Sequence, residues 1–112
     1  MTTHTSYSFV EAGTLQDYMP RLGKIVHIGQ KEIAVFRLSD DRVFALNNQS
    51  PHKKGGPLCE GMISGHYLYD PLYDWKIDLT TGLVQAPDSG QVRTYPVLVE
   101  DNKVRIGFPA ET

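Results

Sequence analysis

The clearest hydrophobic pattern in the chain lies near its C-terminus, in residues 103–108. Apolar and non-apolar positions alternate there, which predicts a β-strand with one buried face that ends at Pro109. Asp101-Asn102 suits a two-residue hairpin turn, and Tyr95 to Val99 form the predicted partner strand. The alternating positions are Val104, Ile106 and Phe108, between Lys103, Arg105 and Gly107.

Short runs of strand-forming residues fill the N-terminal half. Ile33 to Phe36 are apolar without interruption, so we expect both faces of that strand to be covered. Gly29-Gln30 and Asp40-Asp41 are turn signals between the runs, which predicts an antiparallel meander. The predicted strands are Tyr7 to Val10, Lys24 to Ile28, Glu32 to Leu38 and Arg42 to Leu46.

Helix is predicted only as one turn, at Thr14 to Tyr18. Thr14 is a candidate cap, and Asp17 three residues later suits a variant of the capping box. Pro20 follows and ends the turn. No stretch keeps a 3.6-residue period over three turns, so no longer helix is expected. Residues 1–6 are polar and are expected to be frayed.

The stretch from Asn48 to Gly82 interrupts this meander. It contains five glycines and three prolines, which favour fixed loops over long regular elements. Tyr67 to Asp70 and Trp75 to Leu79 are predicted to be short strands in a small layer set apart from the meander. The pattern therefore predicts an all-β domain, an antiparallel barrel or sandwich with a loop-rich subdomain at about residues 48–82.

Composition narrows the function classes. A chain of 112 residues suits one domain, residues 1–112, and the net charge is −2 without a basic stripe, which argues against nucleic acid binding. No apolar run reaches the roughly 18 residues of a membrane helix, and residues 1–5 do not resemble a secretory signal. We therefore expect a cytoplasmic protein. Cys59 is the single cysteine, so neither an internal disulfide nor a pair of thiolates is available.

The central stretch resembles the Rieske iron–sulfur domain. That family carries Cys-x-His, a spacer of about fifteen to seventeen residues, and Cys-x-x-His, which together hold a [2Fe-2S] cluster. The matching positions here are Ser50, His52, Asp70 and Tyr73, and seventeen residues separate His52 from Asp70. The flanking residues that match are Pro51, Gly55-Gly56-Pro57-Leu58, Glu60-Gly61, Pro71, Trp75 and the turn Asp78-Leu79-Thr80-Thr81-Gly82.

The resemblance extends to the loops but not to the ligands. Only His52 keeps the residue type that the Rieske pattern requires, and a [2Fe-2S] cluster needs soft thiolates on one iron. Ser50 and Asp70 offer hard oxygen atoms in place of thiolates, and Tyr73 lacks an imidazole nitrogen. These four residues are therefore interpreted as vestigial cluster positions, with no metal, cofactor-binding or catalytic residue predicted.

One branch of the Rieske-like group has the fold without the ligands: the small subunit of cytoplasmic NAD(P)H-dependent nitrite reductase. The chain resembles this branch in length and in its altered ligand positions. The resemblance implies a non-catalytic subunit in nitrate assimilation, and no cofactor in this chain. It also implies a large catalytic subunit that carries FAD, a [4Fe-4S] cluster and sirohaem and reduces nitrite to ammonium.

Partner contact is predicted at the loop tips. Lys53 and Lys54 adjoin the first vestigial pair, and Tyr73 and Trp75 belong to a dense aromatic group with Tyr67 and Tyr69. Aromatic and basic residues together are typical of interface centres. Core packing of the small layer is the simpler interpretation of the aromatic residues, with Tyr67 and Tyr69 on one face.

Other interpretations remain open at this point. The chain could be a ferredoxin that holds a cluster through unusual ligands, or a module with a ligand pocket between the loop tips. A single metal ion is a further alternative. Cys59 is expected to be a packed thiol, because Glu60 raises rather than lowers its pKa. His52 is expected to stabilise its loop. The candidate metal ligands are His52, Cys59, His66, Asp70 and Tyr73.

Overall fold

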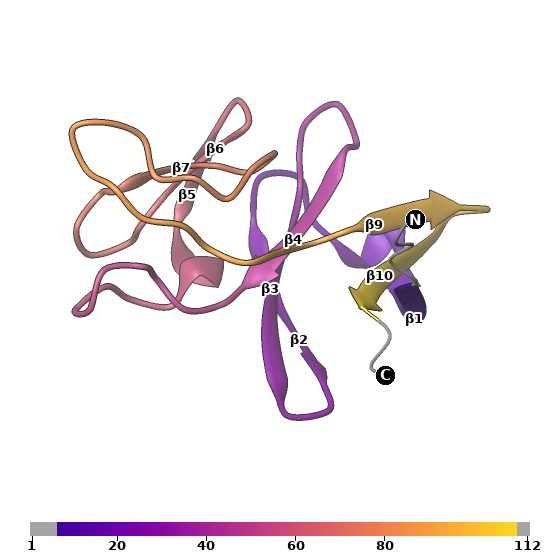
Figure 1. The fold of residues 1–112 in the computed structure, drawn as a ribbon. Helices are drawn as coiled ribbons and strands as arrows, with labels where there is room; N and C mark the ends of the chain where they lie inside the picture. The colour runs from indigo at the N-terminus through magenta and orange to yellow at the C-terminus, as the bar shows by residue number, and fades with distance from the viewer. Residues whose placement is uncertain (1–6, 110–112) are drawn as a thin grey trace, which may run out of the picture.

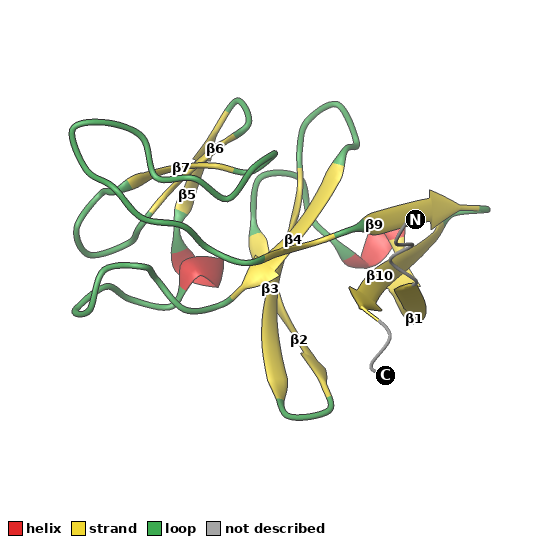
Figure 2. Cartoon of the chain, viewed as in Figure 1, coloured by secondary structure: helices red, strands yellow, loops and turns green. Residues whose placement is uncertain are grey.

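A computed structural model describes residues 7–109, and the expected fraying of residues 1–6 lies outside that range. The described chain forms ten strands in three antiparallel sheets, with two short 3-10 turns and no α-helix (Figures 1 and 2). The predicted all-β antiparallel class is therefore confirmed. No helix in the described part is long and apolar enough to cross a membrane.

The first sheet joins the two ends of the described chain. Its strand order is β1 (Tyr7–Thr14), β10 (Lys103–Pro109) and β9 (Val97–Glu100). The predicted hairpin between β9 and β10 is confirmed. Asp101 and Asn102 have φ of 50° and 68°, and positive φ at both central residues is what a two-residue type I′ hairpin turn requires. β1 runs past the predicted end at Val10, because its pairing with β10 continues to Thr14.

The second sheet is the predicted meander. It contains β2 (Gly23–Ile28), β3 (Lys31–Arg37) and β4 (Val43–Asn47), and the short β8 (Thr94–Tyr95) pairs with β4. Residues 33–36 are fully buried, as predicted. Ala34 and Phe36 enter one core cluster, and Ile33 and Val35 enter another, so β3 separates two cores.

The predicted strand from Tyr95 to Val99 is wrong as a single element. Pro96 divides it: Tyr95 pairs with Ala45 in the second sheet, whereas Val97 pairs with Ile106 in the first. Proline has no N–H for a strand ladder, and its carbonyl instead accepts the Gly107 N–H at 2.8 Å. The chain therefore crosses between sheets at this proline.

The third sheet belongs to the central stretch. It contains β5 (Met62–Ser64), β6 (Tyr67–Tyr69) and β7 (Lys76–Asp78), of which only β6 and β7 were predicted, each slightly longer than observed. A 3-10 turn, η2 (Leu58–Glu60), precedes β5. Both missed elements are three residues long, too short for a periodic signal. In Figure 1 this sheet and its loops lie at one end, the first sheet lies at the other, and β3 and β4 lie between them.

The central stretch forms a sheet of its own, as predicted, but this sheet has no separate core. Its buried side chains share one cluster with β3 and β4, so the two sheets are packed as a unit. Tyr67 and Tyr69 lie half-buried on the face opposite Leu68, as alternation predicts. The members of the shared cluster are Ala34, Phe36, Leu38, Leu46, Leu58, Ile63, Leu68, Ile77, Leu79, Val84 and Val92.

The predicted helical turn is present as a 3-10 turn, η1 (Leu15–Asp17). The Thr14 N–H donates to Asp17 Oδ2 at 2.8 Å, which is the acidic half of the capping box. Arg37 on β3 donates to the Tyr18 carbonyl at 3.1 Å and thereby ties this connector to the meander.

Candidate functional site

Two loops form the site: residues 48–57 between β4 and η2, and residues 70–75 between β6 and β7. The first loop is organised by Ser50, which is 7% exposed. Its Oγ accepts the His52 N–H at 3.1 Å, a local turn in which the hydroxyl replaces a backbone acceptor. Ser50 thus shapes its own loop by accepting a hydrogen bond from the His52 backbone.

Asp70 joins the two loops. Its side chain is fully buried, and each carboxylate oxygen accepts one backbone N–H: Oδ1 from Gly56 at 3.2 Å and Oδ2 from Tyr73 at 2.9 Å. A buried carboxylate is stable only when donors surround it, and charge-assisted hydrogen bonds of this kind are stronger than neutral ones. Asp70 therefore stabilises its own loop through the Tyr73 N–H and connects it to the first loop through the Gly56 N–H.

Gly55 lies where the two side chains meet. A Cβ at this residue would be 2.2 Å from Ser50 Oγ and 3.0 Å from Asp70 Oδ1. No side chain fits there without displacing one of them. The glycine predicted as a loop residue therefore has a specific role, because it makes room for the Ser50 hydroxyl beside the Asp70 carboxylate.

The tips of the two loops are closed by stacked rings. The His52 imidazole stacks on the Tyr73 ring, with ring centroids 3.9 Å apart and an interplanar angle of 10°. The Trp75 ring packs against His52 in a T-shaped arrangement, with centroids 4.8 Å apart. His52 Nδ1 also accepts the Lys54 N–H at 3.0 Å. His52 thus stabilises its loop, as expected. The stacking fills the place where a pocket between the tips was considered.

The residues at the four Rieske ligand positions do not fit a [2Fe-2S] cluster. The structure brings Ser50, His52, Asp70 and Tyr73 together, yet they offer one imidazole, a hydroxyl, a phenol and a carboxylate, with no thiolate. Both Asp70 oxygens and the His52 Nδ1 already accept backbone N–H groups. Cluster chemistry therefore has no ligand set at this position.

The candidate ligands for a single metal ion do not converge either. Across residues 7–109, no group of three or more histidine, cysteine, aspartate or glutamate side chains is placed to hold a metal ion. His66 lies instead 3.8 Å from Asp78 and against the Tyr67 ring. Cys59 lies on η2, which packs against β2 and β3 rather than at the loop tips.

The closing turn after β7 is held by Asp78. Its Oδ1 accepts hydrogen bonds from the Thr80 hydroxyl at 2.6 Å and from the Thr80 N–H at 2.8 Å. These hydrogen bonds lower the pKa of Asp78 below its usual range, and the one from the hydroxyl has the larger effect. Gly82 follows with φ of 78°, and a Cβ there would lie 2.2 Å from the Val92 carbonyl oxygen. The turn therefore requires glycine for both conformation and space.

Cys59 is a packed thiol, as expected. Burial is the largest cause that raises its pKa, and the charge of Glu60 adds to this effect. We expect its alkylation by iodoacetamide at pH 8 to be slower than that of free cysteine, because the thiolate is the nucleophile. A rate profile against pH should have its midpoint above that of free cysteine, and a midpoint below it would contradict the assignment. The control is the alkylation rate of Cys59 in the urea-denatured chain.

The exposed part of the site lies at the loop tips. Lys53 and Lys54 are exposed, Leu72 is 66% exposed and Tyr73 is 46% exposed. We call these four residues the loop-tip surface. Trp75, which was also predicted to contact a partner, is half-buried and packs against the core cluster behind the tips, and that predicted contact stays a prediction. Leu72 was not among the predicted contact residues, and its exposure is seen only in the structure.

Comparison with known protein families identifies the family of this chain. The family model of the Rieske-like [2Fe-2S] domain matches residues 8–107. The chain therefore belongs to the Rieske-like [2Fe-2S] domain family, although three of the four ligand positions, Ser50, Asp70 and Tyr73, hold other residue types.

The relatives fall into two groups. The anthranilate 1,2-dioxygenase ferredoxin subunit of Burkholderia cepacia is 37% identical over 79 residues, which cover 70% of this chain and 71% of that protein. The nitrite reductase [NAD(P)H] large subunit of Klebsiella oxytoca is 34% identical over 98 residues, or 81% of this chain. This chain spans only 10% of that larger protein.

Solved structures share the fold. A protein described as an NADH-dependent nitrite reductase small subunit, from Mycobacterium tuberculosis, superposes with a TM-score of 0.85. It is 20% identical, and the match covers 95% of this chain and 99% of that one. At this identity the likeness establishes the fold alone.

Proposed function

We propose that this chain is the non-catalytic small subunit of a cytoplasmic NAD(P)H-dependent nitrite reductase that reduces nitrite to ammonium in nitrate assimilation. One observation carries the proposal: the loop frame of the Rieske domain is kept, while its ligand positions are used for internal contacts. Asp70 links the loops through backbone N–H groups, and His52 stacks on Tyr73. FAD, the [4Fe-4S] cluster and sirohaem belong to the large subunit in this proposal.

The sequence match to a segment of the Klebsiella nitrite reductase large subunit supports this assignment. The fold shared with the mycobacterial small subunit is compatible with it. Because the Klebsiella large subunit contains a segment similar to this chain, we infer that this chain forms a stable contact with the catalytic part of such a reductase.

The loop-tip surface is the proposed contact. It combines exposed apolar area at Leu72 and Tyr73 with two lysines, and such a mixture suits an interface with an apolar centre and a charged rim. The closed loop core behind it keeps the tips in place before binding. Less ordering is then needed on association, which favours affinity.

Co-purification tests the proposal. The tagged chain, expressed beside a sirohaem-containing reductase from the same source, is expected to retain that reductase and to change its rate of nitrite turnover. A chain that neither binds the reductase nor alters nitrite turnover would refute the assignment. The spectrum of sirohaem in the eluted fraction provides the readout for binding.

Reversing the charge of two loop-tip lysines is expected to weaken this association. For Lys53→Glu/Lys54→Glu, we expect a dissociation constant about tenfold higher at low salt, with a smaller difference at high salt, because rim charges act through screened attraction. Lys103→Glu on β10 is the matched control, since Lys103 is exposed on another sheet. Equal effects of the two variants would move the interface away from the loop tips.

A second candidate is an electron-transfer ferredoxin for an oxygenase. The 37% identity to the anthranilate dioxygenase ferredoxin subunit favours it. The donor set at the loops opposes it, because a Rieske cluster requires two thiolates. Iron and sulfide analysis with low-temperature EPR of the reduced protein separates the two. Stoichiometric iron with a Rieske signal would establish the ferredoxin, and a colourless, EPR-silent protein would exclude it.

A further inference from the structure

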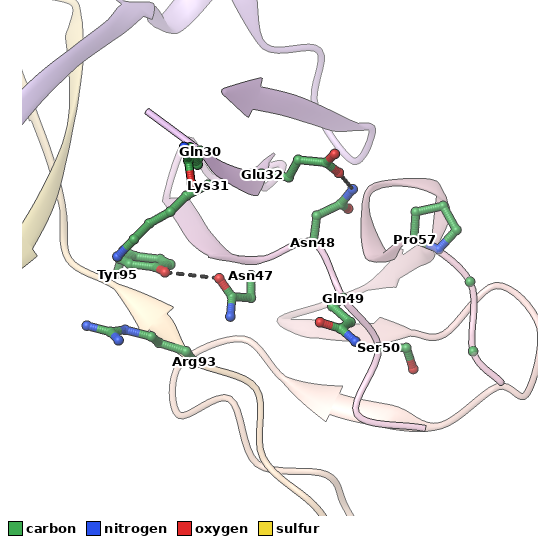
Figure 3. Close-up of a pocket in the computed structure, with 12 residues that line it drawn as sticks. Gln30, Lys31, Glu32, Asn47, Asn48, Gln49, Ser50, Pro57, Arg93 and Tyr95 are labelled. Atoms are coloured by element: carbon green, nitrogen blue, oxygen red, sulfur yellow. Dashed lines mark hydrogen bonds between the residues drawn. The ribbon is translucent and has the colours of Figure 1, made fainter. Parts of the chain in front are cut away.

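A polar groove lies at the base of the first loop, beside β3 and β4 (Figure 3). Its volume is about 610 Å³, and it is open to solvent rather than enclosed. It shares Ser50 and Gly55 with the loop core but contains none of the loop-tip residues. The groove is lined by residues 30–32, 47–50 and 55–57 together with Arg93 and Tyr95.

One end of the groove is positively charged. Lys31 Nζ and the Arg93 guanidinium lie 5.7 and 5.3 Å from the centre of the Tyr95 ring. That ring is 5% exposed, and its hydroxyl donates to Asn47 Oδ1 at 2.9 Å, so it is a fixed platform. Neither cation forms an ion pair with any residue of the described range. Both cations therefore line the groove next to the Tyr95 ring, and Lys31 Nζ also lies 5.4 Å from the centre of the Phe108 ring.

Side-chain amides line the rest of the groove. Asn48 is fixed, because its Oδ1 accepts the Cys59 N–H at 2.8 Å and its Nδ2 lies 3.4 Å from Glu32 Oε1. Gln30 lines the groove beside Lys31, and the exposed Gln49 lines it beside Ser50 (Figure 3). An amide has both donors and acceptors, so it can pair with the N–H and the C=O of a peptide backbone.

The shape and polarity of the groove select the class of ligand. Small-molecule sites bury most of their ligand, whereas this groove is open to solvent and is lined mainly by polar residues. Two cations in a chain of net charge −2 fall short of the basic surface that nucleic acid binding requires. Of the ligand classes considered, an acidic peptide fits the groove best, because its carboxylates can pair with lysine and arginine side chains.

We propose that this groove binds an extended acidic peptide segment of a protein partner. A carboxylate of the segment pairs with Lys31 and Arg93, and its backbone lies along the amides of Gln30 and Gln49. The site is separate from the loop-tip surface and does not depend on the partner being a nitrite reductase.

The test is a titration of the isotope-labelled chain with the peptide Ac-(Asp-Gly)₃-NH₂, followed by two-dimensional ¹H–¹⁵N NMR at low salt. Amide shifts are expected at residues 30–32, 47–50 and 93–95, with much smaller ones for Ac-(Asn-Gly)₃-NH₂. Lys31→Gln/Arg93→Gln should raise the dissociation constant roughly fivefold, as two exposed charge pairs imply. Lys31→Arg/Arg93→Lys should keep it within about twofold, because both charges remain.

Two control variants make the test specific. Lys53→Gln/Lys54→Gln and Lys103→Gln should leave the peptide affinity unchanged, because those lysines lie outside the groove. The inference is overturned if these variants weaken binding as much as the groove variant does, or if no groove amide shifts. It is also overturned if free citrate binds the same amides as tightly as the peptide, which would indicate a site for small anions.

Discussion

Replacing Asp70 with alanine is expected to lower the free energy of unfolding by about 2–4 kcal/mol, because one buried and one part-buried N–H group lose their acceptor. The donors are those of Gly56 and Tyr73, one from each loop. Urea denaturation followed by tryptophan fluorescence measures the change, and Trp75 is the single tryptophan. The His52–Tyr73 stack should also loosen, since the Tyr73 N–H is one of the two that Asp70 holds.

Two variants calibrate this prediction. Asp70→Asn keeps one acceptor oxygen and should lose less stability than Asp70→Ala. Glu60→Ala removes an exposed carboxylate nearby and should change stability by no more than about 0.5 kcal/mol. A loss for Asp70→Ala no larger than that for Glu60→Ala would show that the carboxylate does not hold the loops together.

Replacing Leu68 with alanine is expected to destabilise the whole domain by about 2–5 kcal/mol, the usual cost of a cavity at a fully buried leucine. Leu68 is 0% exposed on β6 and belongs to the cluster shared with Phe36 on β3. Because one core serves both sheets, unfolding should remain a single transition for all probes.

Leu72→Ala is the matched control for Leu68. Leu72 is 66% exposed in the adjoining loop, so its truncation should leave stability within about 0.5 kcal/mol of the unmodified chain. Separate transitions for the central stretch and the meander in Leu68→Ala would mean that the two sheets do not fold as a unit. The same Leu72 variant should weaken partner binding if the loop-tip surface is the interface.

Asp70 also suggests how the loop frame persists without a cluster. Two backbone N–H groups from different loops point toward one position, which favours a negative group there. In this chain that group is a carboxylate that belongs to the second loop itself. Because the link lies within the chain, it holds the loops without any bound group. This arrangement fits a subunit whose loops serve as a surface, as proposed above.

Sequence alone was sufficient for the fold class and for most strands. The strict alternation in residues 103–108 and the continuous apolar run at residues 33–36 determine which faces are buried, because the side-chain period of a strand is two. The turn at Asp101-Asn102 follows from residue types that tolerate positive φ. The resemblance to the Rieske pattern at Ser50, His52, Asp70 and Tyr73 located the loops of the site.

Tertiary structure decided the rest. The division of the strand at Pro96, the shared core behind Leu68 and the groove at Lys31 and Arg93 all depend on residues far apart in the chain. A local pattern records which residues seek burial but not which distant residues meet them. Sequence showed that Asp70 cannot replace a thiolate, and only the packed loops showed that its two oxygens each hold a backbone N–H.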